Sequence, residues 1–205
     1  MYIVFEGIVG SGKSTQSKKL VEYLRTQYPD REVIHVREPG STPIAEDIRH
    51  LCQAKEWDDE TMHPLTNAYL YAAARAQTLH TVVAPAIARW AIVVSDRSFI
   101  TSLAYQGEAQ GLGFDTVLGV NDEAIRWVLP DMVLYMDIDV DTALSRTFDA
   151  VWDKWEKMGK DFFEKIVIGY KKSEELNILA GRFQSIDARG IQEDIFEEIL
   201  TKISL

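Results

Sequence analysis

Cysteine is nearly absent from this sequence, since Cys52 is the only one among 205 residues. A disulfide framework or a multi-cysteine zinc site within one chain is therefore excluded. Long apolar runs are also missing, and the chain begins directly with a short apolar stretch typical of a strand. We expect a soluble protein in a reducing compartment, most simply the cytoplasm, with no membrane partner.

Basic residues are scarce as well: 22 Lys and Arg stand against 32 Asp and Glu, giving a net charge of −10. This balance argues against a nucleic-acid partner, which would require a basic face. An anionic ligand would have to be held by a few arginines gathered in one place. With 46% hydrophobic residues, the chain can bury one sizeable core, so we expect a single domain over residues 1–205.

Apolar, β-rich runs alternate along the chain with segments of helical periodicity. The runs cover residues 2–5, 32–36, 91–95, 132–137 and 183–187. Helices are expected at residues 13–28, from Pro43, at 60–89, 102–110, 122–128, 140–157 and 160–180, and from about 191. Such long connections exclude hairpins and predict an α/β fold in three layers, a five-stranded parallel sheet with helices on both faces. Ligands bind such sheets at the carboxyl ends of the strands.

The segment FEGIVGSGKST (residues 5–15) follows the first expected strand and precedes a helix. Residues 7–14 fit the phosphate-binding pattern G-x-x-x-x-G-K-[ST] in its required setting. Glycines let backbone N–H groups turn toward an anion, and the helix N-terminus adds positive potential. Lys13 could then reach the β- and γ-phosphates of a nucleotide, while the Ser14 hydroxyl could ligate Mg²⁺.

Charged residues follow two further strands. Asp96 ends the strand at residues 91–95, where it could hold the Mg²⁺ shell or instead cap the next helix. Arg97 is adjacent to it, and Arg37 ends the second strand. Two arginines at neighbouring strand ends favour a second anion site near the phosphate loop. The reaction class that this predicts is phosphoryl transfer, which depends on positioning and charge neutralisation.

Six segments occur in a characteristic order along nearly the whole chain. They are FEGIVGSGKSTQ (5–16), REPGSTPIAEDIRHL (37–51), LYAAARAQ (70–77), DRSFITSLAYQG (96–107), LPDMVLYMDID (129–139) and DFFEKIVIGY (161–170). In these segments the sequence resembles the bacterial-type thymidylate (dTMP) kinases, a family of P-loop nucleoside-monophosphate kinases. The combination of REPG, Asp-Arg and AYQG is specific, whereas the phosphate loop alone is not.

The resemblance implies a P-loop kinase fold with a short lid at about residues 145–160. It implies transfer of the ATP γ-phosphoryl group to dTMP, giving dTDP for dTTP synthesis, with Mg²⁺, in a homodimer. The implied ATP-binding residues are Gly10, Ser11, Gly12, Lys13, Ser14 and Thr15. The implied catalytic residues are Lys13, Arg97 and Arg146, and the implied metal ligands are Ser14 and Asp96.

The same resemblance assigns the nucleoside of dTMP to several side chains. Tyr71 would stack on thymine, at a position where the family commonly has Phe. Ser102 and Gln106 would read the base edge, and Arg75 would bond the base or reach toward the acceptor phosphate. Tyr105 and Tyr170 would flank the sugar.

The phosphates of dTMP are assigned to charged residues. Arg37 and Arg97 would bind them directly, and Arg49 would support the acceptor site. Glu38 would belong to the metal or arginine network.

Three features depart from the family pattern. Val9 stands where the family usually has an acidic residue, and Ser98 stands where it has Tyr or His. The lid offers only Arg146 and a few lysines, with Lys154 where an arginine is common. A lysine cannot make the bidentate clamp of a guanidinium.

Two alternatives remain open on the sequence. The first is a deoxynucleoside kinase acting on a nucleoside such as thymidine, in which Glu38 could deprotonate the sugar hydroxyl. The second is a non-catalytic nucleotide-binding homologue, consistent with Val9 and the sparse lid.

Overall fold

The computed structural model of the chain describes residues 1–53, 60–147 and 158–203. Most of the expected lid, including Lys154, lies outside the described residues.

Five parallel strands form the central sheet, as expected from the apolar runs. They are β1 (Tyr2–Glu6), β2 (Val33–Arg37), β3 (Ile92–Asp96), β4 (Met132–Asp137) and β5 (Phe183–Asp187). Their order across the sheet is β2-β3-β1-β4-β5. The register aligns Arg37 with Asp96 and Asp96 with Phe5, so that the ends of β2, β3 and β1 meet at one edge.

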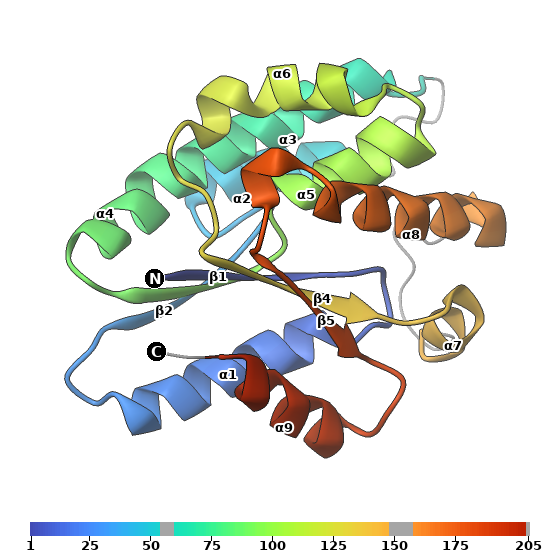
Figure 1. Ribbon diagram of the computed structural model, residues 1–205. Coiled ribbons are helices and arrows are strands. Elements are labelled where there is room, and N and C mark those ends of the chain that lie inside the picture. Colours follow the sequence, from blue (N-terminus) through green and yellow to red (C-terminus); the bar gives the residue numbers. More distant parts are fainter. Residues whose placement is uncertain (54–59, 148–157, 204–205) are drawn as a thin grey trace.

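Helices cover both faces of this sheet, which gives the three expected layers (Figure 1). One face carries α1 (Lys13–Gln27) and α9 (Gln192–Lys202). The other carries α2 (Pro43–Gln53), α3 (Pro64–Thr78), α4 (Ala84–Ala88), α5 (Phe99–Ser102), α6 (Phe114–Ile125) and α8 (Lys160–Glu174). The short α7 (Val140–Ser145) follows β4. None of the described helices is both long and apolar enough to cross a membrane.

Several helices differ from the expected boundaries. The segment expected at 60–89 begins at Pro64, where the ring of His63 accepts a hydrogen bond from the Leu65 amide, and passes through a π-helical turn, η1 (Leu79–Val83). This turn ends two residues before Pro85, which has no N–H to donate to the helix. The helix expected at 122–128 is wrong in its bounds, because α6 already begins at Phe114 and ends at Ile125. A second π-helical segment, η2 (Leu103–Ala109), continues α5, and a short 3₁₀ turn, η4 (Asn177–Leu179), follows α8.

Gly10 in the phosphate loop cannot be replaced without damage. Its φ is +75°, and a Cβ there would lie 2.1 Å from the carbonyl oxygen of Ala143 in α7. We expect Gly10→Ala to lower the unfolding free energy by more than about 2 kcal/mol, because backbone strain and a backbone clash combine. Urea unfolding measures this loss. Gly119→Ala is the matched control, since Gly119 lies in α6 with open space around it, and it should be neutral or stabilising.

Candidate active site

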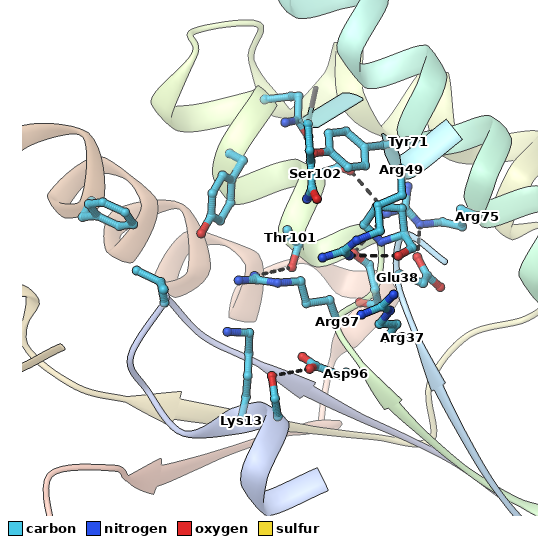
Figure 2. A pocket seen from close by; sticks show the side chains of 18 residues that line it. Lys13, Arg37, Glu38, Arg49, Tyr71, Arg75, Asp96, Arg97, Thr101 and Ser102 are labelled. Carbon is cyan, nitrogen blue, oxygen red and sulfur yellow. Dashed lines mark hydrogen bonds and ion pairs between the residues drawn. The ribbon is translucent and has the colours of Figure 1, made fainter. Parts of the chain in front are cut away.

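The carboxyl ends of β1, β2 and β3 open into a cavity of about 230 Å³. Most of the side chains implicated by the sequence line it, although they come from widely separated segments (Figure 2). These lining residues are Lys13, Ser14, Arg37, Glu38, Arg49, Tyr71, Arg75, Asp96, Arg97, Ser102, Tyr105 and Gln106.

The phosphate loop forms one side of the cavity. Gly12, with φ +84°, is the N-cap of α1, and its carbonyl accepts hydrogen bonds from the amides of Thr15 and Gln16. The Lys13 side chain is only 7% exposed, and its Nζ donates to the Ile8 carbonyl at 3.2 Å. Val9 lies on the cavity wall nearby. Four residues that the sequence assigns to ATP binding do not line the cavity: Gly10, Ser11, Gly12 and Thr15. Any contact that they make with ATP would lie outside this cavity, along the phosphate loop.

Ser14 and Asp96 meet at the foot of the cavity, where the Ser14 hydroxyl donates to Asp96 Oδ2 at 2.5 Å. The other oxygen, Oδ1, is buried and has no hydrogen-bond partner in the part of the chain that the structure describes. A hydroxyl and a carboxylate with a spare oxygen suit Mg²⁺, which takes few protein ligands and keeps waters and substrate phosphates. In the described ranges, no group of three or more His, Cys, Asp or Glu is placed so that it could hold a metal ion.

Ser98, not Asp96, caps the helix that follows β3. Its hydroxyl accepts from the Ile100 amide at 3.2 Å, the usual geometry of an N-cap. The capping alternative for Asp96 is therefore wrong, and its Oδ1 is left for a ligand.

Three guanidinium groups line the cavity near the ends of β2 and β3. Arg37 donates to both carboxylate oxygens of Glu46, at 3.0 and 2.9 Å, and Arg49 donates to the Pro39 carbonyl. Arg97 extends into the cavity (Figure 2). Its guanidinium lies 5.5 Å from the centre of the Tyr105 ring. Burial, followed by the nearby positive charge of Arg37, lowers the pKa of Arg49. Such concentrated positive potential in an acidic protein is suited to a phosphorylated ligand.

Arg75 is held by protein groups on several sides. Its Nε donates to Glu38 Oε2 at 2.6 Å in an ion pair whose side chains are 3% and 2% exposed. Its other nitrogens bond Asn121 Oδ1, the Ser98 carbonyl and the Ser102 hydroxyl. Burial raises the pKa of the Glu38 carboxyl. Arg75 thus joins α3, α5 and α6 at the cavity wall.

The opposite end of the cavity is aromatic and amide-rich. Tyr71 is 8% exposed there, and Tyr105 packs edge-on against Phe162. Gln106 Nε2 donates to Asn67 at 3.1 Å, while Gln106 Oε1 is buried and has no partner among the described residues. An acceptor without a partner beside an aromatic wall can receive a hydrogen bond from a planar base.

Besides the four residues of the phosphate loop, two further predicted site residues do not line the cavity. Tyr170 is completely buried behind Arg97, which donates to the Tyr170 hydroxyl at 3.1 Å. Arg146 points elsewhere: it donates to the carbonyls of Ala188 and Arg189, both at 2.7 Å. The wall that Tyr170 was expected to form is made in part by Phe163 of α8.

Sequence reasoning also missed several residues that build the site. Thr101 and Phe163 line the cavity, and Glu6, Asn67 and Asn121 bond to residues that line it. Thr101 could have been found, since it lies in the DRSFITS segment. No local pattern marks Asn121, which is an ordinary polar residue within a helix.

Comparison with known proteins decides the family. The family model for thymidylate kinase matches residues 5–199 of the chain. The chain belongs to the thymidylate kinase family. It is 43% identical to a thymidylate kinase of Finegoldia magna, over 98% of this chain and 96% of that protein. A thymidylate kinase of Thermosipho africanus is 37% identical over 97% of this chain and 95% of its own. The crystal structure of thymidylate kinase from Ehrlichia chaffeensis matches with a TM-score of 0.77 and 27% identity, covering 98% of this chain and 97% of that one.

Membership in the thymidylate kinase family confirms the resemblance and the P-loop kinase fold expected from the sequence. It also confirms the expected enzyme class, an ATP:dTMP phosphotransferase. The deoxynucleoside kinase and the non-catalytic homologue are not favoured.

Proposed function

We propose that the cavity is where the γ-phosphoryl group of ATP passes to dTMP. One observation carries the proposal: the phosphate loop with Lys13 and the arginines Arg37, Arg49 and Arg97 face one cavity. The loop suits the donor triphosphate, and the arginines suit an acceptor that already carries a phosphate.

On the donor side, the loop amides and the α1 N-terminus would hold the ATP phosphates, with Lys13 Nζ on the transferred group. Ser14 and Asp96 would hold Mg²⁺, whose charge offsets that of the phosphates when it is bound. The loop backbone at residues 10–15 fixes the geometry, so little reorganisation is required during transfer.

On the acceptor side, Arg97 and Arg37 would bind the dTMP phosphate, with Arg49 beside them. A phosphate oxygen is itself a competent nucleophile, so no side-chain base is needed. Glu38 is committed to Arg75 by an ion pair of 2.6 Å, which argues against its use as a base. Tyr71 would stack on thymine and Gln106 Oε1 would accept a base N–H, while Ser102 and Arg75 form the polar wall behind them.

Arg146 supports the donor side indirectly in this proposal. It holds the carbonyls that follow β5, and Gln16 of α1 donates to the carbonyl of Gln192, the first residue of α9, at 2.8 Å. Arg146 would therefore position the segment at residues 188–192 beside the phosphate-loop helix.

We further propose a cytoplasmic homodimer. Ile44 and Leu51 on α2 and Tyr69 on α3 are exposed apolar side chains on two helices that pack together. Burying such side chains against a second copy would remove apolar surface from water. Light scattering of the wild type and of Tyr69→Glu tests this proposal, since the substitution should shift the mass toward the monomer.

The substrate is tested by coupling ADP release to a spectrophotometric readout across a panel of nucleoside monophosphates. We expect turnover with dTMP above that with dCMP, dAMP and dGMP, and turnover about 10³-fold lower in Lys13→Ala, which serves as the blank. Turnover of another monophosphate in preference to dTMP would refute the substrate assignment.

A further inference from the structure

Glu6 is a buried carboxylate for which the mechanism above has no use. It ends β1, is 0% exposed and does not line the cavity. Its Oε1 accepts from the amide and hydroxyl of Ser98, at 2.8 and 2.7 Å, and its Oε2 accepts from the Thr101 hydroxyl at 2.6 Å. Burial raises the pKa of Glu6, and hydrogen bonds from Thr101 counter this effect. The carboxylate accepts all three hydrogen bonds, so both of its oxygens must act as acceptors.

The bond to Thr101 orients a second contact. A threonine hydroxyl has one proton, and Thr101 gives it to Glu6, so the oxygen lone pairs are left to accept. Arg97 Nη1 donates to that same oxygen at 3.2 Å, as Figure 2 shows. The carboxylate therefore acts on the guanidinium through a hydroxyl whose direction it sets.

The bonds to Ser98 act on the backbone. Arg97 has φ +77°, a left-handed conformation that costs a residue with a side chain about 1 kcal/mol. Glu6 holds the very next residue, Ser98, by both its amide and its hydroxyl. The strained turn that points Arg97 toward the cavity is thus fixed from β1, the strand that also leads into the phosphate loop.

The guanidinium is held from one side. Within the described ranges, its hydrogen bonds all run through Nη1, to the Gly7 carbonyl, the Thr101 hydroxyl and the Tyr170 hydroxyl. Nε and Nη2 are left to bind a ligand in the cavity. A guanidinium anchored at one nitrogen can present the other two as a planar fork to phosphate oxygens.

We propose that Glu6 is a positioning residue that fixes Arg97 for the acceptor phosphate, through Thr101 and the backbone at Ser98. This inference rests on the proposed function, because it takes Arg97 as the ligand of the dTMP phosphate. The competing explanation is a purely structural carboxylate, which would affect folding but not the acceptor selectively.

Glu6→Gln tests the relay while preserving size. One end of the glutamine amide becomes a donor, so it cannot accept the Thr101 proton while it also accepts both bonds from Ser98. The Thr101 hydroxyl proton then rotates away from residue 6, and it can occupy the direction from which the Arg97 N–H donates to the Thr101 oxygen. We expect kcat/KM for dTMP to fall on the order of tenfold to a hundredfold, with KM for ATP within about twofold of wild type.

Two comparisons keep this result interpretable. Wild-type turnover of dTMP is measured first, so failure of the proposed function would show in the wild type and not only in the variant. Glu108→Gln is the matched control, because it makes the same change from acid to amide outside the cavity. Glu108 lies in η2 and pairs with Lys172 of α8. It should leave both KM values unchanged.

Variants of Thr101 test the relay even if Glu6→Gln folds poorly. Thr101→Val keeps the shape and removes the hydroxyl, and should raise KM for dTMP selectively, whereas Thr101→Ser should recover most of the loss. If Glu6 acts through Thr101, the effect of Glu6→Gln combined with Thr101→Val will be smaller than the product of the two single effects. Equal losses for ATP and dTMP, no change in either single variant, or fully multiplicative effects would overturn the proposal.

Discussion

Replacing Lys13 with alanine lowers kcat for dTMP phosphorylation by about 10³-fold, the largest effect we expect on activity. The Lys13 ammonium faces the cavity from the phosphate loop and is nearly buried, so its charge acts in a medium that screens it weakly. The alanine side chain leaves the loop backbone in place, because alanine favours the helix that begins here. Steady-state assays with saturating ATP and dTMP measure the loss.

Lys18→Ala is the control for that experiment. Lys18 lies on the same helix with its side chain exposed to solvent, so its removal changes the net charge equally but leaves the cavity intact. We expect its kcat to match that of the wild type. A Lys13→Ala enzyme that retained more than about a tenth of wild-type turnover would contradict the assignment of the donor site.

Replacing Arg75 with methionine lowers the unfolding free energy by about 3–5 kcal/mol, the largest effect we expect on stability. The substitution leaves Glu38 buried without its cation and also removes the bonds to Asn121, Ser98 and Ser102. Equilibrium unfolding in urea at neutral pH measures the loss.

Neutralising Glu38, the partner of Arg75, distinguishes the cost of a buried unpaired charge from the cost of lost packing. The double variant Arg75→Met with Glu38→Gln should regain a large part of the lost stability, because no unpaired charge remains. Arg89→Met breaks the pair with Glu32, an ion pair whose side chains are about half exposed, and should leave stability nearly unchanged. If Arg75→Met were no more damaging than Arg89→Met, the buried network would not hold the helices together.

The parts of this structure that sequence could predict are those encoded locally or by simple topology. The phosphate loop is recognisable because eight consecutive residues carry its chemistry. Arg37 and Asp96 could be placed at one edge because parallel strands end together, and the register does align them. The start of α6 was missed, because Gly111, Gly113 and Gly119 make the stretch from residue 111 look like a loop.

The parts that sequence could not predict depend on contacts between distant segments. Arg75 contacts Glu38 and Asn121 across sequence separations of 37 and 46 residues. The sequence around each of the three residues gives no indication of its partner. Tyr170 was expected to face the ligand but is buried behind Arg97, and Phe163 of the same helix lines the cavity. Arg146 was expected at the phosphates, and the direction of its side chain is set by carbonyls more than 40 residues away.

The central claim is that the arginine-lined cavity is built for an acceptor that already carries a phosphate. The most direct measurement is kcat/KM for dTMP and for thymidine, in the same assay with the same ATP concentration. Because thymidine lacks the phosphate that we propose Arg37 and Arg97 bind, dTMP should be preferred by on the order of 10³-fold or more. Thymidine used as well as dTMP, or better, would contradict the account.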